Sequence, residues 1–255
     1  TSGDGAPRIE RPFLPMGGMR PWSPIPIEEC HDALVALPPQ LLRLEPHPYA
    51  SLGAPYGEGA SPFRLRQGVV ERLIQAQATL QRFQPSWRLA VFDAWRPVAV
   101  QAFMVEHAIR CECQLQGVDP HRDTPERQAV VESVGRFWAP PSSDPATPPP
   151  HSTGAAVDLT LADPQGQVLP MGGEIDAIGV ISEPDYYAGP AAAHPEGQAA
   201  QWHAQRCLLR EAMASAGFAQ HPNEWWHFSW GDQLWAWRSG QPKAHYGATA
   251  SNPSI

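Results

Sequence analysis

One stretch constrains the fold of this chain most strongly: His151-Ser-Thr-Gly154-Ala-Ala-Val-Asp158-Leu-Thr-Leu161. It follows a proline-rich segment, so we expect His151 on a loop, and Gly154 permits a sharp or positive-φ turn shortly after it. The small, apolar and branched residues that follow predict a buried strand that carries Asp158. A loop imidazole and a strand carboxylate therefore converge on one point across the glycine turn.

A second stretch, Glu224-Trp-Trp-His227-Phe-Ser-Trp230, supplies another carboxylate and another imidazole. Residues three apart point to opposite faces of a strand but to the same side of a helix or turn. We therefore expect a bend or bulge within Glu224–His227, with the two intervening tryptophans packed behind it. Together the two stretches offer two His, one Asp and one Glu. That set suffices for a catalytic zinc ion with three protein ligands, an open position for water and a neighbouring carboxylate base.

Each of these residues also has a purely structural interpretation. A His beside a strand is more often hydrogen-bonded within the fold than bound to a metal. An Asp after a glycine turn is usually a turn residue or a cap, and a buried Glu near Trp can belong to a structural ion pair. The joint occurrence of the two stretches favours a metal site over these alternatives. His221, close to the second stretch, is a further candidate ligand that we do not favour.

The combined pattern, His-x-x-Gly-x-Ala-x-Asp followed by Glu-x-x-His with Trp before the His, resembles the zinc peptidases that cut D-alanyl bonds in peptidoglycan precursors. Among them, the chain is most similar to the D-alanyl-D-alanine dipeptidases of the VanX type. Two further segments carry the resemblance: Phe92–Pro97 looks like the family's aromatic-Arg-Pro element, and Leu169–Asp176 looks like its Met-Gly hairpin. The resemblance runs from Arg88 to Trp230 in the order found in the family.

The resemblance implies that His151, Asp158 and His227 hold one zinc ion per chain and that Glu224 is the general base. Zinc lowers the pKa of its water toward ~7. Glu224 would take the proton of the water that attacks the peptide carbonyl, and would then deliver it to the leaving amine. The reaction expected from the resemblance is hydrolysis of the D-Ala-D-Ala dipeptide by a zinc metallopeptidase.

Two more residues have roles implied by the resemblance. Arg96 lies between a predicted strand and a helix and would stabilise the oxyanion, whereas a structural ion pair with Asp93 is the alternative. Asp176 would pair with the ammonium group of the substrate, whereas a turn or cap role is the alternative. The chain departs from the family at Pro149, where many relatives have Ser, and at 173–175, which lack the usual hydroxyl and Phe. Both departures concern how the ends of the substrate are held.

Other functions compete with the dipeptidase. A D,D-carboxypeptidase or L,D-endopeptidase of the same superfamily would act on peptidoglycan peptides, and longer substrates need an open cleft. A non-catalytic, zinc-bearing cell-wall binding module is disfavoured by the presence of Glu224 and Arg96. A metal-free structural domain would bind no zinc at all.

Charge and composition limit the partners. The formal net charge is −8 and no run of basic residues is present, which disfavours a nucleic-acid partner. No apolar run approaches membrane-spanning length. A small dipeptide is thus the expected partner, and the oligomeric state stays open.

The cysteines and the N-terminus bear on the compartment. The four cysteines are Cys30, Cys111, Cys113 and Cys207, and an even number permits two disulfides without requiring them. No signal peptide is visible in the sequence, and whether one was removed stays open. We favour a periplasmic or secreted location over a cytoplasmic one.

Local patterns predict the order of elements. Helices are expected over Glu28–Leu37, Gly68–Phe83, Pro97–Gln116, Glu126–Phe137 and Gln198–Ala216. In the helix expected over Gly68–Phe83, apolar residues recur every three or four positions, at Val69, Leu73, Ala76, Leu80 and Phe83, and this spacing predicts a buried stripe. Strands are expected over Trp87–Phe92, around Trp225–Trp230 and around Gln233–Trp237. The loop over 46–67 is expected to cover the cleft, and residues 140–150 to form a wall of the site.

These elements predict one α+β domain with helices packed on a mostly antiparallel sheet. The resemblance implies the Hedgehog/DD-peptidase-like zinc peptidase fold. We expect an extended N-terminal arm over residues 1–27, a zinc dipeptidase domain over 28–242 and a poorly ordered tail over 243–255.

Overall fold

The computed structural model describes residues 19–250 of the chain. Its strands are β1 (Leu34–Ala36), β2 (Leu42–Arg43), β3 (Arg64–Arg66), β4 (Arg88–Asp93), β5 (Ala156–Ala162), β6 (Ala219–Gln220) and β7 (His227–Ser229). Its α-helices are α1 (Pro48–Ser51), α2 (Gln67–Phe83), α3 (Val98–Gln116), α4 (Pro125–Gly135), α5 (Ala188–Ala193), α6 (Gln198–Ser215) and α7 (Gln233–Ser239). Two short 3-10 helices, η1 (Pro150–Thr153) and η2 (Val180–Ser182), complete the described elements.

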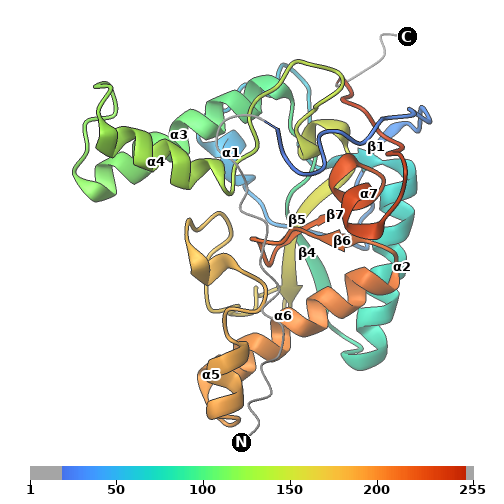
Figure 1. The fold of residues 1–255 in the computed structure, drawn as a ribbon. Helices are drawn as coiled ribbons and strands as arrows, with labels where there is room; N and C mark the ends of the chain where they lie inside the picture. Colours follow the sequence, from blue (N-terminus) through green and yellow to red (C-terminus); the bar gives the residue numbers. More distant parts are fainter. Residues whose placement is uncertain (1–18, 251–255) are drawn as a thin grey trace, which may run out of the picture.

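A five-stranded sheet in the order β2-β4-β5-β7-β6 lies at the centre of the molecule (Figure 1). β2 runs parallel to β4, and the other three neighbouring pairs of this sheet are antiparallel. β1 and β3 form a separate antiparallel pair. The predicted α+β fold with helices on a mostly antiparallel sheet is therefore confirmed.

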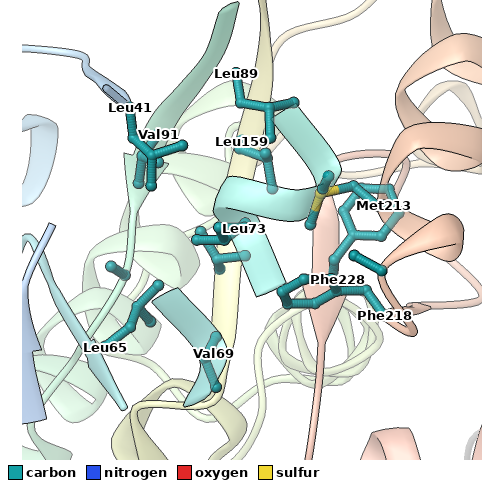
Figure 2. Packing of buried hydrophobic residues seen from close by; sticks show 14 of the residues in the cluster. Leu41, Leu65, Val69, Leu73, Leu89, Val91, Leu159, Met213, Phe218 and Phe228 are labelled. Atoms are coloured by element: carbon teal, nitrogen blue, oxygen red, sulfur yellow. The ribbon is translucent and has the colours of Figure 1, made fainter. Parts of the chain in front are cut away.

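The main hydrophobic core lies between this sheet and the helices α2 and α6. Figure 2 shows Leu73 of α2 and Met213 of α6 in one cluster with Leu159 of β5 and Phe228 of β7. Alternate residues of a strand face opposite sides of a sheet, so Asp158 points away from this core. The helices thus occupy one face and leave the other face of β5 for polar residues.

The apolar stripe predicted for the first long helix is buried at four of its five positions. Val69, Leu73, Ala76 and Leu80 are buried on α2, as expected. Phe83 is 55% exposed, contrary to the prediction. It is the last residue of α2, where the chain leaves the core for the turn before β4.

A second hydrophobic cluster lies under α1, α3 and α4, which run together on the other side of the molecule (Figure 1). It contains Tyr49, Trp95, Val100, Met104, Val130, Val134 and Trp138. α3 ends at Gly117, whose φ of 67° is a left-handed helix cap, as the sequence predicts. This cluster matters for function because Tyr49 and Trp138 also reach the polar face of the sheet.

Two predicted elements are wrong. Residues 28–37 form no helix; Leu34–Ala36 pairs instead as β1 with β3, because tertiary pairing overrides a short ambiguous apolar run. Gln233–Trp237 is part of the helix α7, not a strand. The Asp232 carboxylate accepts a hydrogen bond from the Trp235 N–H at 2.8 Å and caps the helix, and Gly240 ends it in the left-handed conformation.

The expectation of a poorly ordered tail is wrong for residues 243–250. Ala244 pairs with Ile27 in a parallel bridge, and Tyr246 is buried and donates a hydrogen bond to Asp32 at 2.7 Å. Burial of an aromatic ring holds this segment against the N-terminal side of the domain. Residues 251–255, and residues 1–18 of the expected arm, lie outside the described part of the chain.

The structure also bears on the cysteines and on the length and polarity of the helices. All four cysteines are free, and none of them is joined in a disulfide. Among the helices that the structure describes, none combines the length and the apolar character needed to cross a membrane.

Candidate active site

Strand pairing brings the two predicted motifs together. β5 and β7 are neighbours in the sheet, and their register sets Asp158 directly opposite His227. His151 lies on η1, which ends at Gly154 with a φ of 71° just before β5 begins. The glycine turn and the strand pairing therefore deliver three side chains to one point on the polar face of the sheet, as the sequence predicts.

The three side chains are buried and in mutual contact. His151 Nε2 lies 3.1 Å from Asp158 Oδ2, and His227 Nδ1 lies 3.1 Å from Asp158 Oδ1. The two imidazole nitrogens are 3.3 Å apart. One ligand atom from each residue lies within 4.8 Å of the others, which is compact enough for a single metal ion. Among the described residues, no other set of His, Cys, Asp and Glu side chains has this arrangement.

Hydrogen bonds from outside this set orient the two imidazoles. His151 Nδ1 donates a hydrogen bond to the Ala94 carbonyl oxygen at 2.7 Å, since a carbonyl can only accept, and the lone pair of Nε2 is therefore free for a metal ion. His227 Nε2 lies 3.2 Å from Ser229 Oγ, so its Nδ1 faces Asp158. Each imidazole thus presents one nitrogen to the same point.

The donor set fits a zinc ion. Asp158 Oδ1 is buried and makes no hydrogen bond to a described residue, although His227 Nδ1 lies 3.1 Å from it, so this oxygen has an electron pair to offer a metal ion. Burial opposes ionisation of Asp158, but His151 and His227 hold its pKa well below its usual range. Two imidazole nitrogens and one carboxylate oxygen are ligands typical of catalytic zinc. The residues present could therefore hold the ion that the sequence predicts.

Glu224 lies beside the three candidate ligands. Its Oε2 is 3.5 Å from His227 Nδ1, because residues 221–226 turn before β7 begins, which is the predicted bend. Burial, with the nearby charges of Asp158 and Asp176, raises the pKa of Glu224 well above its usual value. A carboxyl group with a raised pKa, placed next to a metal site, can accept and return a proton near neutral pH.

Arg96 is held beside the candidate ligands by several hydrogen bonds. Its Nε and Nη2 donate to Asp93 Oδ2 at 3.0 and 2.7 Å, and its Nη1 donates to Gln101 at 2.7 Å. The ion pair with Asp93, which is the structural alternative, is therefore present. Arg96 Nη2 nevertheless also reaches Asp158 Oδ2 at 3.4 Å, so the guanidinium borders the candidate metal ligands.

Asp93 is itself fixed from a second side. His47, the N-cap of α1, places its Nε2 2.8 Å from Asp93 Oδ1. Burial opposes ionisation of Asp93, but Arg96 and His47 together keep its pKa below its usual range. Asp93 thus remains a charged anchor for Arg96. The loop that carries His47 lies within the predicted cleft-covering segment 46–67.

Asp176 lines the same cavity as the candidate ligands. Its φ of 68° is left-handed, which Asp tolerates better than most residues. Tyr49 donates its hydroxyl to Asp176 Oδ2 at 2.6 Å. Burial and the charge of Asp158 raise the pKa of Asp176 to about 7. Both the turn role and a carboxylate that faces the cavity are therefore compatible with its position.

His221, the unfavoured candidate ligand, lies near the site but outside the ligand set. Its Nδ1 accepts a hydrogen bond from the Asn223 N–H at 3.1 Å. Burial and the neighbouring His227 lower the pKa of His221 well below its usual value, so it is a neutral ring. It packs edge-on against both Trp22 and the candidate ligand His227, with ring centroids 5.7 and 5.4 Å away.

Sequence reasoning missed several residues of the cavity. Its wall includes Arg20 and Trp22 from the N-terminal segment and Trp138 after α4. Trp138 and Tyr49 stack on the Arg96 guanidinium, each with its ring centroid 5.0 Å from it. No motif marks these positions, because long-range packing alone brings them to the site. Pro150, at the end of the proline-rich segment, also lines the cavity.

The fold and the site together are those of a metallopeptidase. The chain belongs to the peptidase M15 family, described as D-ala-D-ala dipeptidase, which matches residues 43–245. This match confirms the resemblance found in the sequence. It spans all the site residues predicted from the sequence.

Individual relatives agree with the family. A protein from Synechocystis sp. named D-alanyl-D-alanine dipeptidase is 46% identical over 227 residues, which cover 88% of this chain and 92% of the relative. Proteins of the same name from Escherichia coli and Enterococcus faecium are 30% and 27% identical, over 55% of this chain in both cases and over 54% and 60% of their own lengths.

Proposed function

We propose that this protein hydrolyses the free dipeptide D-Ala-D-Ala with one zinc ion held by His151, Asp158 and His227. The observation that carries the proposal is the convergence of these three buried donors beside a fourth residue, Glu224, whose Oε2 lies 3.5 Å from His227 Nδ1. The names of the relatives support this choice of substrate. When bound, a zinc ion supplies a Lewis acid that activates water and polarises the scissile carbonyl.

Glu224 is the general base and then the general acid in this proposal. A pKa raised above the usual carboxyl range increases its affinity for a proton, so it can take one from the attacking water and then pass it to the leaving amine. Its position 3.5 Å from a candidate ligand atom supports this role, because the carboxylate lies beside the point on which the three candidate ligands converge.

Arg96 stabilises the oxyanion that forms as the carbonyl is attacked. Its bonds to Asp93 and Gln101 fix the guanidinium before the substrate arrives, so little reorganisation is needed in the transition state. The rings of Tyr49 and Trp138 exclude water from its faces, which strengthens its electrostatic effect.

Asp176 pairs with the ammonium group of the dipeptide. The hydrogen bond from Tyr49 orients the carboxylate, and Asp176 lines the same cavity as the candidate zinc ligands. A buried carboxylate that binds an ammonium group favours a free N-terminus over an acylated one. The proposed substrate is therefore a dipeptide rather than an internal segment of a longer peptide.

Release of D-alanine by the zinc-loaded protein tests this function. We expect cleavage of D-Ala-D-Ala and little or no cleavage of N-acetyl-D-Ala-D-Ala, with zinc-loaded Glu224→Gln as the inactive control. Preferential cleavage of the acetylated peptide would make the protein a D,D-carboxypeptidase. Failure to cleave either peptide, with one zinc ion bound per chain, would overturn the proposal.

A further inference from the structure

The cavity contains a second guanidinium, that of Arg20, which has no role in the reaction described so far. Arg20 precedes β1 in the chain and is only 9% exposed. Its Nη2 donates to the backbone carbonyls of Gly135 and Trp138, at 2.6 and 2.9 Å. These two bonds anchor the end of the side chain at the junction that follows α4, in the wall of the cavity.

No residue in the described part of the chain neutralises the positive charge of Arg20 by an ion pair. Within residues 19–250, no carboxylate lies at ion-pair distance from it, and its Nε and Nη1 make no hydrogen bond. Burial lowers the pKa of Arg20, and the more distant charge of Glu224 opposes this effect. A buried cation without a partner costs free energy unless an anion joins it. The position is thus suited to an anionic group that enters the cavity.

The other guanidinium of the cavity, that of Arg96, does not offer a comparable site for the carboxylate of a substrate. Arg96 is already bound to Asp93 and Gln101 and borders Asp158. Pro149 and Pro150, which precede His151, have neither a backbone N–H nor a side-chain donor. A free dipeptide nevertheless carries a carboxylate that must be desolvated when it enters the cavity.

We propose that Arg20 binds the C-terminal carboxylate of the substrate. This inference rests on the proposed function. The leaving amine and the carboxylate are bonded to the same carbon atom of the dipeptide, so the group that holds the carboxylate must lie near the group that protonates the amine. Arg20 meets this requirement, because it lines the same cavity as Glu224 and its positive charge opposes the rise in the pKa of Glu224.

Because Arg20 and Asp176 both line the cavity, it offers a partner for each charge of a dipeptide. A guanidinium can donate two parallel hydrogen bonds to a carboxylate, and the free Nε and Nη1 of Arg20 are available for this purpose. His221 and Trp22 also line the cavity and pack edge to face with ring centroids 5.7 Å apart. A substrate extended or amidated at its C-terminus would leave the guanidinium without its partner.

The test compares two substrates that differ only in this charge, D-Ala-D-Ala and D-alanyl-D-alaninamide, on the zinc-loaded enzyme and on Arg20→Gln. Gln keeps a donor for the two backbone carbonyls but removes the charge. Since a charge-assisted bidentate bond is lost, we expect kcat/KM for the acid to fall by about 10- to 100-fold, mainly through KM, and that for the amide by less than about 3-fold. Arg20→Lys should retain part of the preference for the acid.

Arg72→Gln is the matched control. Arg72 also donates to a backbone carbonyl, that of Ala216 at 2.9 Å, but it packs on Trp230 away from the cavity. The Arg72→Gln variant should leave the ratio of kcat/KM for the acid to kcat/KM for the amide unchanged. If Arg20→Gln lowers kcat/KM equally for the acid and the amide, their ratio stays unchanged. Arg20 would then be a structural residue, and the inference would be overturned.

A failure of the proposed function would be seen separately. If the enzyme cleaves only acetylated peptides, the same comparison is made with N-acetyl-D-Ala-D-Ala and its amide. If it cleaves neither, binding of the dipeptide and its amide is followed through the fluorescence of Trp22 and Trp138, which adjoin Arg20. Tighter binding of the acid that disappears in Arg20→Gln would support the inference, and equal affinities would refute it.

Discussion

Replacing Asp176 by Asn should stabilise the metal-free protein above pH 7 while impairing recognition of the substrate's ammonium group. The substitution preserves the local geometry. Asn tolerates the left-handed φ of 68° found at this position, and an amide oxygen can accept the hydrogen bond that Tyr49 donates at 2.6 Å. The variant therefore removes a buried charge with little change in shape.

The size of the effect follows from the pKa. Burial and the charge of Asp158 raise the pKa of Asp176 from 3.8 to about 7. A difference of about 3 pKa units between unfolded and folded states corresponds to about 4 kcal/mol. Because the folded state favours the protonated carboxyl, its contribution to stability is complete below pH 3.8 and is lost as the pH rises through 7. Asn does not titrate, so its advantage over Asp grows over this interval.

Urea unfolding of the two metal-free proteins between pH 4 and pH 8 measures this difference. The free energy of unfolding of Asp176→Asn, relative to the natural protein, should rise by about 1.4 kcal/mol per pH unit until it levels off near pH 7. Asp123→Asn, an exposed carboxylate that also accepts a side-chain hydrogen bond, is the control and should show no such rise. A difference that is independent of pH would refute the reasoning. Bound zinc should reduce the effect, since it offsets the charge of Asp158.

Three further predictions concern the candidate metal centre. Zinc-loaded Glu224→Gln should lose at least about 10²-fold in kcat, because the proton acceptor is gone; near-full turnover would exclude it as the base. His151→Ala should lose stoichiometric zinc, measured by elemental analysis after dialysis, and retention of one ion per chain would remove His151 from the ligand set. Gly154→Ala should cost about 2–4 kcal/mol in urea unfolding, because its φ is 71° and a Cβ would lie 2.7 Å from Leu34 Cδ1. A loss below about 0.5 kcal/mol would contradict this steric argument.

The sequence predicted the parts of the site that local geometry determines. Gly154 and the branched residues after it define a turn and a strand, so the convergence of His151 and Asp158 could be foreseen. The bend before His227 followed from the requirement that Glu224 and His227 share a side. These inferences needed only the period of a strand and the conformational freedom of glycine.

The parts that depend on distant packing could not be predicted. Arg20 and Trp138 reach the cavity because the segment before β1 lies against the end of α4, and no spacing in the sequence encodes this contact. The helix α7 was predicted as a strand because its tryptophans favour strands, although the capping residue Asp232 was a usable signal. Burial of Tyr246 likewise depends on a partner, Asp32, that lies more than two hundred residues earlier.

The balance of charge in the cavity links the metal to the unusual carboxyl groups. Arg96 and Asp93 neutralise each other. The remaining charged groups of the wall are the carboxylates of Asp158, Asp176 and Glu224 and the guanidinium of Arg20. In the metal-free protein this is an excess of negative charge, and two of the three carboxyl groups respond by a raised pKa. A divalent cation at Asp158 offsets that excess, so Asp176 can ionise to bind an ammonium group and Glu224 can exchange a proton. The same carboxyl groups that destabilise the empty cavity are therefore those that the proposed reaction requires.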